Sequence, residues 1–412
     1  MADRRLTRLR ALRAWAAMPA WVRVALIYLA ARAVTTGLVL LAAALAPADG
    51  QISGPGALQA FTLSWDAQWY WLVAADGYPQ ELPTDDGGHV AQNAWAFMPV
   101  YAYLSQAVGV VLGGSWGAGA FLVSFVSGYV VCLLLFQLIR TRQGDAQALW
   151  AAAFAAAGPL SPLFHIGYAE SLFLVELLAA LLCVVRRRWW PLYALVPVMA
   201  FTRPGLQAFA LMLALYGVRR WLRRRDDPLP AREIAHIVTI GLLAAAAGFA
   251  WQAIAGAVTG EPGAYLDTEL AWRRAWVGTV EFAPLEGWFS AAGVWFGVWG
   301  LPAWLAPVAV IALIGLAALL VLVPRSVRRM GPELRMWTAS YLVYLFLVFF
   351  PQSSVFRLLA PLIPLAGAAA AVRPERLPVR WVRLGLLAVG LAGQWLWIWF
   401  MWGNGTTYWQ VP

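Results

Sequence analysis

Long apolar stretches, separated by short polar segments, occupy most of this 412-residue chain. Several approach the roughly 20 residues that a helix needs to cross the hydrocarbon core of a membrane. A chain in lipid must satisfy its backbone hydrogen bonds internally, so such stretches predict membrane-spanning helices. We predict an all-α polytopic membrane protein of about 10–12 transmembrane helices. The predicted spans lie near 24–46, 117–139, 146–160, 171–185, 235–257, 293–323, 336–350, 358–372 and 383–402.

The charge distribution predicts which side of the membrane each loop occupies. Hydrophobic residues make up 62% of the chain and charged residues only 12%, against about 25% charged in soluble domains. All 30 basic residues are arginines, and the net charge is +10. They form short clusters beside apolar stretches, as cytoplasmic anchors do, and this placement does not require a nucleic-acid partner. The clusters predict a cytoplasmic location for 4–13, 140–142, 186–188, 219–225, 325–335 and 373–383.

Two polar loops are predicted on the outer side, at about 47–94 and 258–292, and the first holds acids but no arginine. The chain must cross the membrane an odd number of times between the first loop and the cytoplasmic cluster at 140–142. Because 95–139 contains two apolar stretches, we interpret the first of them, 95–113, as re-entrant or interfacial. The first span is too long for the apolar region of a signal peptide and should remain uncleaved. The whole of 1–412 then forms one transmembrane domain with a cytoplasmic N-terminus and an outer tail at 403–410.

Arg32 and Arg203 interrupt apolar stretches of the chain. Arg32, in the first span, should face the bundle interior or reach an interface, because a charge exposed to lipid is costly. Arg203 interrupts the short stretch between two cytoplasmic clusters, in Thr202-Arg203-Pro204-Gly205. We predict two half-length helices that meet at Arg203 inside the membrane, with one long tilted span as the alternative.

The first outer loop contains the most unusual stretch, Leu63-Ser64-Trp65-Asp66-Ala67-Gln68-Trp69-Tyr70-Trp71. On a helix, Phe61, Trp65, Trp69 and Leu72 would share one face, and Asp66 and Tyr70 the neighbouring face. Tryptophan and tyrosine are enriched at membrane interfaces. The stretch therefore predicts an interfacial helix that presents an acid, and a simple surface-anchoring helix is the alternative.

The predicted topology brings further polar residues toward the same outer side. They are Asp66, His165, Tyr168, Glu170, Arg203, Gln352 and Arg357. Charges at membrane depth are functional candidates because they are costly to keep there. Structural alternatives remain: Glu170 could cap the helix that starts near Ser171, His165 could be a hydrogen-bonded structural residue, and the two arginines could pair with Glu170 alone.

These residue types support transfer of a group onto a hydroxyl. A carboxylate such as Asp66 can take the proton of an attacking hydroxyl, and an arginine can bind and neutralise a departing phosphate. We predict no cofactor, although a divalent metal held by several outer acids stays open. The sequence contains no phosphate-binding glycine loop, no His-Glu-x-x-His and no Cys/His cluster with metal-binding spacing.

Five motifs follow one another along the chain. The first outer loop holds Trp65-Asp66, Trp69-Tyr70 and Gly77-Tyr78, and the next segment holds Phe97-Met98-Pro99-Val100-Tyr101. Later come Tyr168-Ala169-Glu170-Ser171-Leu172-Phe173, Thr202-Arg203-Pro204, and Arg357 before Pro361 and Pro364. In this order they resemble the PIG-V type of integral-membrane mannosyltransferases, which belong to the GT-C class.

The resemblance implies a GT-C-like bundle that transfers mannose, with inversion, from a polyprenyl-phosphate-mannose donor. The implied acceptor is a lipid-linked glycan or glycolipid on the outer face of a bacterial plasma membrane. It also implies that an acid of the first loop is the base, which corresponds to Asp66. From charge and placement we assign the donor phosphate to Arg203 and Arg357. The predicted substrate-binding residues are Trp65, Trp69, Tyr70, Tyr101, His165, Tyr168, Glu170 and Gln352.

Two other classes of function remain as alternatives. A transporter or flippase of a polyprenyl-linked sugar would also use broken helices and intramembrane charges. It should show inverted repeats with charges at the midplane between them, whereas here the charges cluster toward one side and no repeat is evident. A non-catalytic membrane scaffold would tolerate the loss of Asp66.

Overall fold

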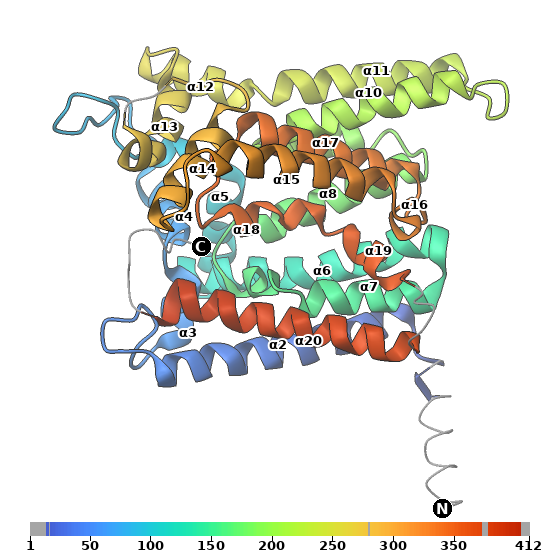
Figure 1. Cartoon of the computed structure of the whole chain (residues 1–412), viewed down its shortest axis with the longest axis horizontal. Coiled ribbons are helices and arrows are strands. Elements are labelled where there is room, and N and C mark those ends of the chain that lie inside the picture. The colour runs from blue at the N-terminus through green and yellow to red at the C-terminus, as the bar shows by residue number, and fades with distance from the viewer. Residues whose placement is uncertain (1–13, 16, 279–280, 373–377, 405–412) are drawn as a thin grey trace, which may run out of the picture.

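The computed structural model describes residues 14–15, 17–278, 281–372 and 378–404. The arginine cluster at 4–13, part of the cluster at 373–383 and most of the predicted outer tail lie outside these residues. Within them the chain is helical, apart from one isolated bridge between Thr84 and Val90. The long helices lie side by side with roughly parallel axes, and their connections gather at two ends (Figure 1). The protein is an all-α polytopic membrane protein, as predicted.

Five stretches of the described chain are long and apolar enough to cross a membrane. They are α2 (Ala20–Leu45), α6 (Trp116–Gln143), α11 with α12 (Ala231–Ala247 and Ala250–Thr259), α15 (Leu305–Leu322), and α20 (Val379–Ile398) with η4 (Trp399–Gly403). They confirm the spans predicted near 24–46, 117–139, 235–257 and 383–402. By contrast, α5 (Pro99–Val111) has 13 residues and is only about 20 Å long. Its length agrees with a re-entrant or interfacial piece.

Shorter helices complete the bundle. They are α7 (Asp145–Ala157), α8 (Glu170–Val185), α9 (Leu192–Ala200), α10 (Leu206–Leu222) and α17 (Pro332–Val348). Helix α8 packs against α6, α9 and α17, and its buried residues run from Glu170 to Val184. A helix that is apolar on all sides belongs in a core. Helix α8 thus holds its first residue, Glu170, in a fixed buried position.

Three predicted spans are shorter than expected, because glycine and proline interrupt them. In the stretch near 146–160, the helix ends at Ala157, and the chain continues after Pro159 as η2 (Ser161–His165). The stretch near 293–323 is divided by Gly300 and Pro302 into α14 (Glu286–Val298) and α15. The stretch near 358–372 is a chain of short turns, because Pro361 and Pro364 lack backbone donors. These turns are η3 (Ala360–Leu362) and α19 (Leu365–Ala370), after α18 (Val355–Leu358).

The break at Arg203 is present as predicted, although α10, with 17 residues, is longer than the half-length helix expected there. Helix α9 ends at Ala200, helix α10 begins at Leu206, and the connection contains Pro204 and Gly205 with a φ of 121°. Such a φ favours glycine because it lacks a β-carbon. The alternative of one long tilted helix is therefore wrong. Thr202 anchors the connection by donating a 2.9 Å hydrogen bond to Glu176 of α8.

The two ends of the bundle differ in charge. The start of α2, the connection between α10 and α11, and α16 (Arg325–Arg328) lie at one end, called here the arginine-rich end (Figure 1). Helices α3 (Ala57–Leu63), α4 (Asp66–Asp76), α12 and α13 (Ala264–Val277) lie at the opposite end, called here the loop end. The segments that were predicted on opposite sides of a membrane are thus at opposite ends of the bundle.

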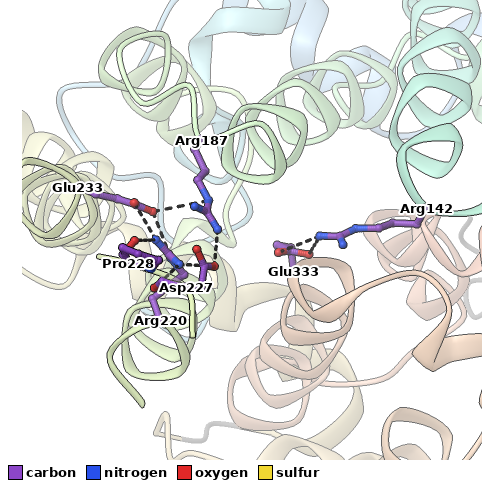
Figure 2. A network of polar contacts seen from close by, with 7 residues as sticks. All are labelled: Arg142, Arg187, Arg220, Asp227, Pro228, Glu233 and Glu333. Atoms are coloured by element: carbon purple, nitrogen blue, oxygen red, sulfur yellow. Dashed lines mark hydrogen bonds and ion pairs between the residues drawn. The ribbon is translucent and has the colours of Figure 1, made fainter. Parts of the chain in front are cut away.

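A network of ion pairs joins helix termini at the arginine-rich end (Figure 2). Arg220 of α10, only 1% exposed, donates a 2.8 Å hydrogen bond to Glu233 of α11 and also binds Asp227. Arg187, just after α8, donates a 2.5 Å hydrogen bond to Asp227, and this bond lowers the pKa of that carboxyl. The network therefore closes the α10–α11 connection and ties it to α8.

Candidate active site

The predicted helix around Asp66 is broken in two. Helix α3 ends at Leu63, α4 begins at Asp66, and Trp65 between them has a φ of 56°. Non-glycine residues in such a conformation cost about 1–3 kcal/mol and persist where the surroundings hold them. Ser64 is held on both sides, because Trp402 donates a 2.6 Å hydrogen bond to its hydroxyl and Tyr168 a 3.5 Å bond to its carbonyl.

The break changes which residues share a face. Phe61 on α3 is buried against the ring of Trp402 at 4.7 Å, whereas Trp69 on α4 stacks on Phe97, in a different apolar cluster. The prediction of one continuous apolar face from Phe61 to Leu72 is therefore wrong. The break also makes Asp66 the first residue of α4, where the partial positive charge of the helix N-terminus favours a carboxylate.

Four charged residues meet at the loop end of the bundle. Arg357 of α18 forms ion pairs with Asp66 and, at 3.4 Å, with Glu170. Arg203, in the break between α9 and α10, pairs with Glu170 from the other side. Glu170 is 2% exposed, while the other three side chains are 14–16% exposed. Two carboxylates and two guanidiniums thus form a neutral, partly accessible row.

Glu170 begins α8 as the capping alternative requires, but its carboxylate bonds to arginines. The residue before it, Ala169, makes no side-chain cap. The ion-pair partners of Glu170 are Arg203 and Arg357. Both arginines therefore belong to a network that also includes Asp66. The alternative of pairing with Glu170 alone is therefore wrong for Arg357, whereas the ion pair described for Arg203 is with Glu170 alone.

The environment of Asp66 suits a proton acceptor. Burial raises the pKa of the Asp66 carboxyl, while the positive charge of Arg357 opposes this rise. A base whose pKa lies closer to the working pH takes a proton more effectively than an ordinary aspartate. The guanidiniums of Arg357 and Arg203 stand beside it and can neutralise an anion.

Aromatic rings surround the charged row. The Arg357 guanidinium lies 5.3 Å from the Tyr168 ring centre. Tyr70 packs edge-on against Tyr101 at 5.2 Å, and the Tyr101 hydroxyl bonds with Ser124 at 2.8 Å. Trp69, one turn after Asp66 on α4, stacks on Phe97 at 5.6 Å. The indole nitrogen of Trp65 is buried and has no hydrogen-bond partner among the described residues.

His165 makes its polar contacts outside this row. His165, at the end of η2, interacts with Arg32 at 3.0 Å and with Thr36 at 3.2 Å. Arg32 faces the bundle interior, as predicted, and donates to the carbonyls of Ala156 and Ser161. The histidine is thus part of the scaffold that leads to Tyr168. Gln352 lies in the turn before α18, and no described hydrogen bond joins its side chain to Asp66 or Glu170.

The structure adds an acid that the sequence reasoning missed. Glu269 of α13 hydrogen-bonds with Tyr265 and interacts electrostatically with Asp66 and Arg203. Tyr344 of α17 adjoins the same region, because a β-carbon at position 205 would lie 3.6 Å from its ring. The available signal was the four-residue spacing of Tyr265, Glu269 and Arg273, which places them on one helix face.

The remaining loop acids do not form a metal site among the described residues, where no group of three or more His, Cys, Asp or Glu side chains could hold a metal ion. Asp85 pairs with Arg274 of α13 at 2.8 Å and so connects the two loops.

No protein-family model matches this chain, and a search of curated proteins finds no match. Among solved structures it is similar to ArnT from Cupriavidus metallidurans in the apo state, with a TM-score of 0.46 and 15% identity, covering 88% of this chain and 62% of that one.

It is also similar to the Archaeoglobus fulgidus oligosaccharyltransferase in complex with zinc and sulfate, with a TM-score of 0.45 and 13% identity, covering 91% of this chain and 54% of that one. This chain thus spans less than two thirds of either protein. Because both TM-scores lie below 0.5, we base the functional proposal on the residues of the site.

Proposed function

We propose that this protein is a GT-C-class membrane mannosyltransferase of the PIG-V type. It transfers mannose from polyprenyl-phosphate-mannose to a hydroxyl of a lipid-linked glycan or glycolipid. The observation that carries the proposal is the row formed by Asp66, Arg357, Glu170 and Arg203. Its members come from motifs far apart in the sequence, and they combine a proton acceptor with two groups that bind phosphate.

The reaction is a single displacement at the anomeric carbon. Asp66 accepts the proton of the acceptor hydroxyl. The oxygen of that hydroxyl forms a bond to the anomeric carbon. The bond from carbon to phosphate oxygen breaks on the opposite side, so the configuration inverts and the electron pair leaves with the polyprenyl phosphate. Arg357 and Arg203 stabilise the charge on this leaving group through bidentate hydrogen bonds.

Arg357 pairs with Asp66, so that each side chain neutralises the other in a partly buried position. A donor phosphate competes for the guanidinium, and its binding leaves the carboxylate available to the acceptor hydroxyl. Because arginine clusters mark the cytoplasmic side, we place the loop end and this chemistry on the outer face of a bacterial plasma membrane.

The test uses the purified protein in lipid vesicles with radiolabelled polyprenyl-phosphate-mannose and a glycolipid acceptor. We expect Asp66→Asn to lower the transfer rate of the folded protein by at least about 100-fold. Asp76→Asn, at the exposed far end of the same helix, is the matched control and should retain activity. Full transfer by the Asp66→Asn variant would refute the base assignment. Movement of labelled lipid between leaflets without sugar transfer would instead establish a flippase.

A further inference from the structure

Two adjoining hollows lie between the first loop and α13. The larger, of about 580 Å³, is lined by Trp69, Asp85, Ala91, Gln92, Ala271, Arg274 and Ala275. The smaller, of about 290 Å³, also reaches Arg274 and is lined by residues of 88–90 and of α13. The larger volume lies within the roughly 300–1,000 Å³ of ordinary small-molecule sites. Neither hollow includes the charged row, so this site is separate from the row itself.

The walls of the larger hollow are preformed. Asp85 accepts hydrogen bonds at 3.0 Å from the backbone N–H groups of Gly87 and His89, which hold the loop in shape. The other oxygen of Asp85 accepts from Arg274, whose Nη1 also donates to the Val90 carbonyl at 2.9 Å. The backbone hydrogen bond from His89 is the main cause that lowers the pKa of Asp85, so the carboxyl is ionised at neutral pH.

The pair has hydrogen-bonding capacity left for a ligand. A guanidinium carries five N–H donors on three nitrogens, and the described contacts of Arg274 use Nη1 alone. Trp69 supplies aromatic surface to the same hollow. An acid and a fixed arginine beside an aromatic ring suit a ligand that has both hydroxyl groups and a C–H face. They suit an anion less well, because Asp85 would repel it.

The hollow is also close to the proposed base. Trp69, which lines it, follows Asp66 by three residues on α4. That separation corresponds to about 4.5 Å along the helix axis, on neighbouring faces of the helix. A sugar held at Trp69 is therefore bound one helical turn from the residue that carries the proposed base.

We propose that the hollow between 84–92 and α13 binds the carbohydrate part of the acceptor, with Asp85 and Arg274 hydrogen-bonding its hydroxyl groups and Trp69 contacting its ring. The identification of the bound saccharide as the acceptor rests on the proposed function. The binding of a saccharide at this site does not depend on it. The site thereby selects a glycosylated acceptor over a simple lipid alcohol.

Binding is tested directly by saturation-transfer NMR on the full chain in lipid nanodiscs, with α-1,6-mannobiose as the probe. We expect binding to the wild type, and an affinity roughly tenfold weaker in Arg274→Gln, because a hydrogen bond to a charged group is lost. Asp85→Asn, which keeps the shape of the loop, should weaken binding similarly. Asp86→Asn, next to it and exposed, is the matched control and should bind normally.

The inference is overturned if the disaccharide does not bind the wild type, or if it binds Arg274→Gln and Asp85→Asn as tightly as the wild type. Competition by inorganic phosphate would overturn it too, because it would identify an anion site. The Asp66→Asn variant separates the two proposals. If it binds mannobiose normally and still transfers sugar at the wild-type rate, the saccharide site stands and the base assignment fails.

Discussion

Asp66 and Arg357 are 291 positions apart in the chain and form an ion pair at the loop end of the bundle. Arg357 continues the contact to Glu170, which Arg203 binds from the other side. Each arginine therefore faces a carboxylate. In the proposed mechanism, a donor phosphate replaces one of these contacts.

The first prediction concerns pH. Only the deprotonated carboxylate of Asp66 can accept a proton, so transfer should fall as the pH drops through its pKa. Because burial raises this pKa, the fall should lie above the value of about 3.9 that is usual for aspartate. The measurement is the initial transfer rate between pH 4 and 8, at saturating donor. A rate that stays constant over this window would argue against a carboxylate base with a raised pKa.

The second prediction concerns the arginine that joins both acids. Arg357→Gln leaves Asp66 and Glu170 without this partner, and breaking a buried pair costs about 3 kcal/mol or more. We expect a clearly lower melting temperature in detergent. Arg357→Lys keeps the charge but loses the planar fork, so it should stay folded and raise the KM for the donor. An unchanged donor KM in Arg357→Lys would place the phosphate elsewhere.

The third prediction concerns Glu170, whose negative charge raises the pKa of Asp66. Removing a neighbouring negative charge lowers the pKa of the remaining carboxyl. In Glu170→Gln, the acidic fall of the transfer rate should therefore move to lower pH. Asp76→Asn, exposed at the far end of α4, is the control and should leave the profile in place. A shift to higher pH would show that the two acids do not interact as described.

The fourth prediction separates the two ends of the bundle. Arg220 is buried and binds both Glu233 and Asp227 at the arginine-rich end. Arg220→Ala should lower the stability by about 3–5 kcal/mol, because buried carboxylate charge loses its partner. The KM values for donor and acceptor should stay as in the wild type in the fraction that remains folded. Thermal unfolding and transfer kinetics on the same preparation check both parts.

The membrane class and several element boundaries could be predicted because they depend on local properties. The length of an apolar stretch decides whether a helix can cross a bilayer, and closely spaced prolines and glycines favour the end of a helix. The break between α9 and α10 at Arg203 was predicted on this basis. The same rule, applied to Pro361 and Pro364, would also have shown that 358–372 is no continuous span.

The sequence by itself determined which residues deserved attention, because a charge such as Glu170 or Arg203 within apolar surroundings has a high desolvation cost. Tertiary structure alone decided their partners. The positive φ of Trp65 follows from Tyr168 and Trp402, which hold Ser64 from distant parts of the chain. Glu269 belongs to the second outer loop predicted from the sequence, where acids are common. Only the packing of α13 beside the site distinguishes it from other loop acids. Attraction between charges depends on distance in space, and the spacing of residues along a chain does not reveal that distance.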